Sequence, residues 1–217
     1  MPILLTLVAV ISAVDAGHAD FAQARTTESC ASSGSTTLVQ TRSLRLYSQR
    51  GGVKVACHLA SGRRTVFDNR LRPCFPEICF MRQLRTAGVM VAFDIGNSGR
   101  RGSEYRLRVL NARTGRIVRS VAQGDGAAAL PRRKATLVAL QVRSNGSIVW
   151  ISDVRTETAS MPEAQTYEVR RADTGVRDRG ANELLDSSPE IDPNSLALDG
   201  ANARWTRAGE PRSAPVR

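Results

Sequence analysis

The feature that most constrains this sequence is a recurring hairpin, in which a hydrophobic run turns at a glycine and continues into a second hydrophobic run. Three copies turn at glycines that are 58 and 54 residues apart: Gly88, Gly146 and Gly200. An aromatic residue follows each glycine by four or five positions: Phe93, Trp150 and Trp205. A spacing this regular indicates a repeated structural unit.

A second kind of hairpin alternates with the first. Its turn glycines are 53 and 60 residues apart: Gly62, Gly115 and Gly175. From Tyr105 to Val109, apolar residues alternate with arginines, which is the period of a strand with one buried face. In the first kind, Asn145-Gly146 predicts a type I′ turn with positive φ at both residues. The two hairpins together predict a unit of four strands.

A four-stranded unit of this length is typical of a β-propeller blade, so we predict an all-β fold of propeller-like repeats. The four units expected are a partial blade, two blades and a second partial blade: Leu44–Asp68, Ile78–Val121, Thr136–Gly180 and Ser195–Val216. Propellers have four to eight blades, so four units leave an incomplete or open arrangement as a live alternative. A β-sandwich is the other alternative. Residues 25–217 are expected to form one domain.

The start of the chain has the features of an export signal. Ile3–Val14 is an apolar run of 12 residues, too short to span a bilayer comfortably. Ala22-Gln23-Ala24 then has the A-x-A form of a signal-peptidase site, although no Lys or Arg precedes Arg25. We expect a signal peptide at residues 1–24 and a secreted or cell-surface protein, with an uncleaved anchor as the alternative. No later segment predicts a membrane span, so an integral membrane protein is not expected.

The cysteines number four, and an even count after an export signal predicts two disulfides. Three connectivities are open. Cys74 and Cys79 enclose a short segment with a proline, which favours a local bridge and leaves Cys30 to pair with Cys57. A zinc site is the alternative, but the spacing between Cys74 and Cys79 does not match the usual zinc motifs.

Residues suited to catalysis are few. His18 is expected to leave with the signal, and His58 is then the remaining imidazole, expected on the surface. The chain has no nucleophile elbow and no phosphate-binding loop. Three acidic residues close in sequence could ligate calcium, but their spacing matches no EF-hand and an ordinary link between strands is favoured: Asp186, Glu190 and Asp192. We therefore predict no catalytic residue, no metal and no cofactor.

The net charge is +11, from 31 Lys and Arg against 20 Asp and Glu. Basic pairs such as Arg63-Arg64 and Arg170-Arg171 are scattered along the chain, which favours a solvated surface over a nucleic-acid site. Export also argues against nucleic acid as a partner. Anionic polymers of the cell envelope, or another protein, are the candidate partners. Trp150 and Trp205 are expected in the core rather than as a carbohydrate platform, because they occupy matching positions of the repeat.

The stretches "NGSIVWISD" and "TYEVRRADTG" resemble the blade repeat of TolB-type propellers. In that repeat a Pro-Asp-Gly turn precedes an Ile-Ala-Phe-like strand, and Ser144-Asn145-Gly146 stands in its place here. Over most of Ser43–Arg217 the chain is also similar to uncharacterised exported proteins of actinobacteria. The resemblance implies a non-enzymatic binding or scaffold protein and carries over no catalytic residue. The alternative is an extracellular hydrolase or lyase that acts on a polymer through Asp, Glu and Arg side chains in a cleft between blades.

Overall fold

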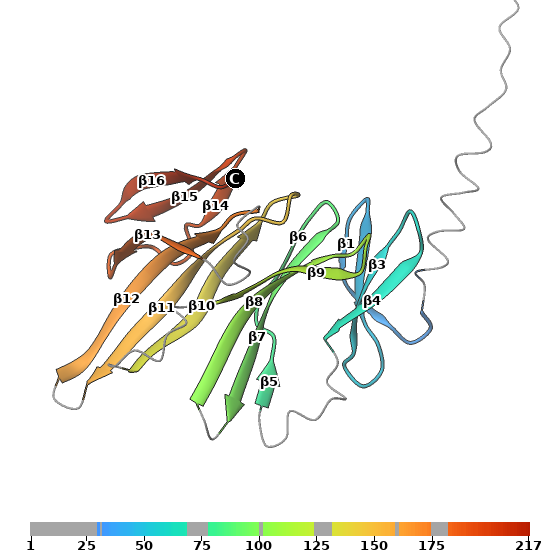
Figure 1. The fold of residues 1–217 in the computed structure, drawn as a ribbon, viewed down its shortest axis with the longest axis horizontal. Helices are drawn as coiled ribbons and strands as arrows, with labels where there is room; N and C mark the ends of the chain where they lie inside the picture. The colour runs from blue at the N-terminus through green and yellow to red at the C-terminus, as the bar shows by residue number, and fades with distance from the viewer. Residues whose placement is uncertain are drawn as a thin grey trace, which may run out of the picture.

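The computed structural model describes residues 30, 32–68, 78–99, 102–123, 132–158, 161–174 and 182–217. The predicted signal peptide and Cys74 lie outside these residues. The described chain is all-β and forms four antiparallel sheets, here numbered 1 to 4 in chain order (Figure 1). The predicted fold class is therefore confirmed. Among the described residues, no helix is long and apolar enough to cross a membrane.

Each sheet is built from strands that are neighbours in the sequence. Sheet 1 has the order β1 (Thr36–Gln40), β2 (Leu44–Ser48), β3 (Lys54–His58) and β4 (Arg63–Asp68). In sheet 2, β5 (Ile78–Phe80) and β6 (Leu84–Ala87) share one edge of β7 (Met90–Gly99), which is followed by β8 (Gly102–Asn111) and β9 (Arg116–Ala122). Sheet 3 contains β10 (Arg132–Val142), β11 (Ile148–Thr158), β12 (Met161–Ala172) and β13 (Glu183–Ser188). Sheet 4 contains β14 (Ala197–Asp199), β15 (Asn202–Arg207) and β16 (Glu210–Pro215).

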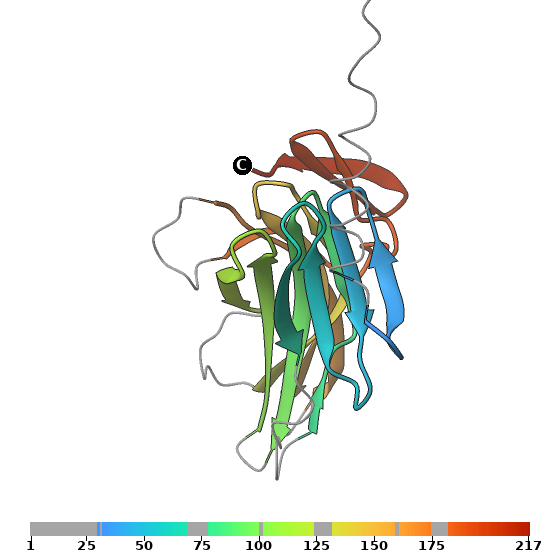
Figure 2. The same cartoon turned by 90° about the vertical axis from the view of Figure 1, so that its right-hand side faces the viewer.

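The sheets stack face to face, and a separate hydrophobic cluster fills each interface. Leu44 and Leu46 of sheet 1 pack with Val91 and Phe93 of sheet 2. The next cluster joins sheets 2 and 3, and a third joins sheet 3 to sheet 4. Sheets 1 and 4 lie at opposite ends of the stack, so the arrangement is open rather than a closed ring (Figure 1). Seen from the side of sheet 1, the strands of sheet 4 run across the direction of the strands in front (Figure 2).

The repeat boundaries differ from the prediction at two units. Sheet 1 is a whole unit, because β1 precedes the predicted start at Leu44. Its first turn has no glycine: the Thr41 hydroxyl accepts hydrogen bonds from the backbone N–H groups of Ser43 (3.3 Å) and Leu44 (3.1 Å). Sheet 3 begins earlier and ends later than predicted, since its fourth strand is β13, beyond Gly180. Sheet 4 has three strands and is the partial unit that the sequence predicted.

The turn at Asn145-Gly146 also differs from the prediction. Gly146 has φ of 91°, but Asn145 is not among the described residues with positive φ, so the turn is not type I′. Hydrogen bonds from Gly146 N to Arg143 O and from Arg143 N to Ser147 O, both 2.9 Å, close a three-residue loop that ends in a left-handed glycine. Asn145 stabilises this loop through its side chain, which accepts a bond from Ser147 N (3.0 Å).

The repeat places one aromatic side chain at the same position in every sheet. Each sheet has a hairpin whose second strand carries this residue: β2, β7, β11 and β15. When the residue that closes the hairpin turn is counted as the first, the fourth is aromatic: Tyr47, Phe93, Trp150 and Trp205. The last three point toward the preceding sheet and belong to the three interface clusters. Trp150 is 0% exposed and Trp205 is 5% exposed, so the prediction of core tryptophans is confirmed. Tyr47 points outward from sheet 1, where Cys30 and Cys57 cover it.

Candidate functional site

The Cys30–Cys57 disulfide is formed as predicted, and it ties the start of the described chain to sheet 1. The bond joins residues 27 positions apart, and both cysteines are buried beside Tyr47 and Val55. The Arg45 guanidinium fixes the same segment by donating from Nη1 to the Cys30 carbonyl (3.0 Å). The disulfide is therefore a structural part of the outer face of sheet 1.

His58, the remaining imidazole, is buried rather than at the surface, and the prediction for it was wrong. The residue is 6% exposed, and its Nδ1 lies 2.8 Å from the Ser61 hydroxyl in the β3–β4 turn. Burial lowers the pKa of His58, and the positive charge of Arg113 lowers it further. The residue anchors a turn.

The three acidic residues considered for calcium do not converge. Asp186 is held on β13 by the Trp205 indole and by Arg207, whereas the Asp192 carboxylate accepts a hydrogen bond from Asn194 N (2.9 Å). Glu190 is exposed. Within the part of the chain that the structure describes, no three His, Cys, Asp or Glu side chains gather as metal ligands do. The calcium interpretation has no support in this geometry.

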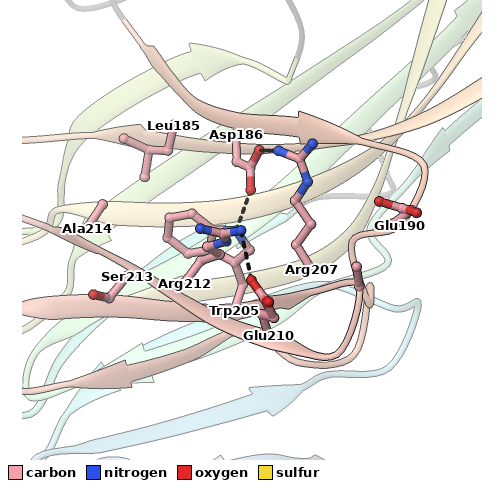
Figure 3. Close-up of a pocket in the computed structure, with 10 residues that line it drawn as sticks. Leu185, Asp186, Glu190, Trp205, Arg207, Glu210, Arg212, Ser213 and Ala214 are labelled. Carbon is pink, nitrogen blue, oxygen red and sulfur yellow. Dashed lines mark hydrogen bonds and ion pairs between the residues drawn. The ribbon is translucent and has the colours of Figure 1, made fainter.

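An open groove lies between β13 of sheet 3 and the strands β15 and β16 of sheet 4 (Figure 3). Leu185 and Ala214 are apolar parts of its lining. Its charged lining residues are Asp186, Glu190, Arg207, Glu210 and Arg212. The groove is thus mainly polar, with opposite charges side by side.

Most of these charges are already paired with one another. Asp186 accepts from Trp205 Nε1 (2.8 Å) on one oxygen and from Arg207 Nη1 (3.0 Å) on the other. Arg212 Nη2 lies 3.2 Å from the Glu210 carboxylate. Both Asp186 oxygens accept hydrogen bonds from sheet 4, so the side chain is held in place between the two sheets. The groove suits contact with a ligand better than proton transfer to one.

The groove lies where a fourth strand of sheet 4 would stack on β13. The fourth strands of sheets 1, 2 and 3 lie next to one another in a column. Arg63 of β4 donates to Thr114 O before β9 (3.4 Å), and Asn182 before β13 donates to Ala122 O of β9 (3.4 Å). Sheet 4 ends at its third strand, so nothing in the described chain covers β13 in the same way. The groove occupies that vacant position.

A second candidate surface follows from the distribution of charge. Residues 25–123 contain 18 Lys and Arg against 5 Asp and Glu, a net charge of +13. Residues 124–217 contain 13 of each, a net charge of 0. The excess positive charge of the chain is therefore carried by the part that forms sheets 1 and 2.

Five exposed arginines of this half lie at or beside the turns at one end of sheets 1 and 2. We call this group the arginine end: Arg42, Arg63, Arg64, Arg113 and Arg116. The turns contact one another, since Ser43 Oγ donates to Gly88 O (2.7 Å) and Arg63 reaches Thr114 O. Of the acidic side chains described in these two sheets, Asp68 pairs with Lys54 and Asp94 is buried.

Sequence reasoning missed both surfaces. The arginines are scattered in the sequence and come together only because turns from different hairpins meet at one end of the stack. The net charge of each half of the chain, counted from the sequence, could have indicated the basic surface. Comparison with models of known protein families gives no match, and comparison with curated protein sequences gives none either.

Proposed function

We propose that this chain is an exported, non-enzymatic binding protein that holds an anionic polymer at the arginine end. The observation that carries the proposal is the charge separation, with +13 in residues 25–123 and 0 in residues 124–217. A surface of one sign attracts polyanions and raises their rate of association. Residues 124–217 contain 13 of the 20 Asp and Glu residues, so most of the acidic residues lie in the other half of the chain.

The ligand class follows from the shape of this surface. The arginines project from neighbouring turns of different hairpins, so together they present a spread surface of positive charge. An isolated exposed ion pair contributes only about 0–1 kcal/mol, so a useful affinity needs several contacts at once. A polymer with repeated phosphate or carboxylate groups supplies them.

Export is supported by two features. The first is the Ile3–Val14 apolar run with the A-x-A site that follows it. The second is the disulfide at Cys30, because structural disulfides persist in oxidising compartments. The anionic polymer is therefore expected in the cell envelope or outside the cell, which favours a phosphate-bearing or uronate polymer of the envelope over nucleic acid.

The test measures binding of two probes, inorganic polyphosphate and poly-glutamate, by titration calorimetry at two salt concentrations. The variant Arg113→Gln with Arg116→Gln should weaken binding about tenfold, at roughly 0.5–1 kcal/mol for each contact. The matched control, Arg155→Gln with Arg204→Gln, removes the same charge from exposed positions of sheets 3 and 4. Binding should fall with salt, since surface charges are screened.

The two pairs of variants separate a located site from a general charge effect. Equal loss of affinity in both would contradict the arginine end as the site. The ratio of the two probe affinities distinguishes a phosphate polymer from a carboxylate polymer.

The hydrolase alternative would have to use the groove, where Asp186, Glu190 and Glu210 supply carboxylates. Its support is weaker, because Asp186 and Glu210 are ion-paired with Arg207 and Arg212. Polymer cleavage that Asp186→Asn abolishes would overturn the non-enzymatic proposal.

A further inference from the structure

Successive residues of β16 direct their backbone groups alternately toward β15 and toward the free edge of the sheet, and the hydrogen bonds show which residues do which. Val216 N donates to Ala201 O (2.7 Å), in line with the pairing of Asn202 with Pro215 and of Arg207 with Glu210. Even-numbered residues therefore direct their backbone N–H and C=O groups toward β15. The odd-numbered residues direct theirs to the free edge: Pro211, Ser213 and Pro215.

This free edge is almost without hydrogen-bond donors. Pro211 and Pro215 have no N–H, which leaves Ser213 as the donor among the three outward residues. The Pro215 carbonyl is also taken, because it accepts a hydrogen bond from Arg171 Nη1 of β12. An added strand would find one N–H where an ordinary edge of this length offers three.

The position beside this edge is otherwise suited to a strand. It is where a fourth strand of sheet 4 would lie, and the described residues place none there; its lining includes Leu185 of β13 and Ala214 of β16. In the other sheets, a strand paired at this position stacks on the fourth strand of the preceding sheet. Exposed edges beside apolar surface are templates for pairing with another chain, and prolines on an edge oppose it.

We propose that Pro211 and Pro215 keep the fourth-strand position of sheet 4 vacant by preventing β16 of one copy from pairing with β16 of a second copy. The prolines therefore hold the groove open. The arrangement they oppose is a two-fold dimer, with the two β16 edges antiparallel.

The test is the double variant Pro211→Thr with Pro215→Thr, which restores an N–H at both outward positions. Its average mass, measured by light scattering after gel filtration, should approach twice that of the wild type as protein concentration rises. The matched control is Pro189→Thr with Pro193→Thr, in the link between β13 and β14, which makes the same chemical change away from the free edge of β16. Its mass should equal that of the wild type.

A third variant separates edge pairing from association by misfolded protein. Ser213→Pro, added to the double variant, removes the outward N–H in the middle of the edge and should lower the average mass below that of the double variant at the same concentration. A double variant that keeps the wild-type mass at all concentrations overturns the proposal. Association that Ser213→Pro does not weaken overturns it as well.

Discussion

The inner and outer sheets of the stack obey different sequence rules. In β11 of sheet 3, four consecutive residues are fully buried: Ile148, Val149, Trp150 and Ile151. In β15 of sheet 4, Ala203 and Trp205 are buried while Asn202 and Arg204 are exposed. An inner sheet is covered on both faces and needs a continuous apolar run, whereas an outer sheet is covered on one face and alternates. The pattern of a strand therefore reports its place in the stack.

The two outer sheets also end the stack in different ways, one by covering its outer face and the other by exposing a polar face. Sheet 1 covers its outward aromatic, Tyr47, with the segment held by the Cys30–Cys57 disulfide. Sheet 4 presents polar residues such as Asn202 and Arg204 to solvent and carries prolines on its free edge. Stacked repeats need terminal units with altered outer surfaces, because an uncovered repeat face would bind another copy.

The largest expected effect comes from an inner interface. Trp150→Ala should lower the free energy of unfolding by about 3–5 kcal/mol, the usual cost of truncating a large core side chain. Trp150 fills the space between sheets 2 and 3, and its Nε1 donates to Gln123 O (3.1 Å). Denaturant unfolding measures the change. Arg204→Ala on the outer face is the control, with an expected change within about 0.5 kcal/mol. Similar values for the two variants would remove the distinction between inner and outer positions.

The next effect concerns the disulfide that holds the covering segment on the outer face of sheet 1. Cys30→Ser with Cys57→Ser should cost about 2–4 kcal/mol, because the bond restricts the unfolded chain across 27 residues. The change should appear in the midpoint of thermal unfolding. Reductant should lower the melting temperature of the wild type more than that of the variant, because only the wild type has this bond to lose. A variant that melts at the wild-type temperature would mean that Arg45 and local packing hold the segment alone.

The smallest effect is the pH dependence from His58. Its pKa is lowered in the folded state by burial and by Arg113, so the unfolded chain binds the proton more readily. Stability should be full above the unfolded value of about 6.5 and should decrease as pH falls from there toward the folded pKa. Melting temperatures between pH 7.5 and 5.5 test this. His58→Gln should flatten the dependence, and Arg113→Gln should reduce it; an unchanged slope in both would assign it to other groups.

Much of the fold could be predicted from local signals. The glycines at turns and the aromatic residues behind them indicated the repeat because both depend on neighbours in the sequence. The first strand of sheet 1 was missed because its turn relies on the Thr41 hydroxyl in place of a glycine. The type I′ turn was wrong because the loop at Gly146 holds three residues, and the Asn145 side chain accepts from the backbone instead of placing Asn145 at positive φ.

The candidate surfaces could not be predicted from local signals. The groove lies where the described residues of sheet 4 do not continue the column of fourth strands. The arginine end exists because Arg63 and Arg113, 50 residues apart in the sequence, belong to turns that meet. His58 was placed at the surface because nothing in its immediate sequence shows that the turns of sheet 1 bury it.

The open stack has a consequence for how such a chain can change over evolutionary time. A closed propeller must divide a full circle among its blades, so adding one blade alters the angle at every interface. In this molecule each hydrophobic cluster joins only consecutive sheets. Duplication of one inner unit, such as residues 78–123, would create one new interface and leave the two ends as they are. The number of units is therefore free to vary by gene duplication, and only the first and last units must keep their special surfaces.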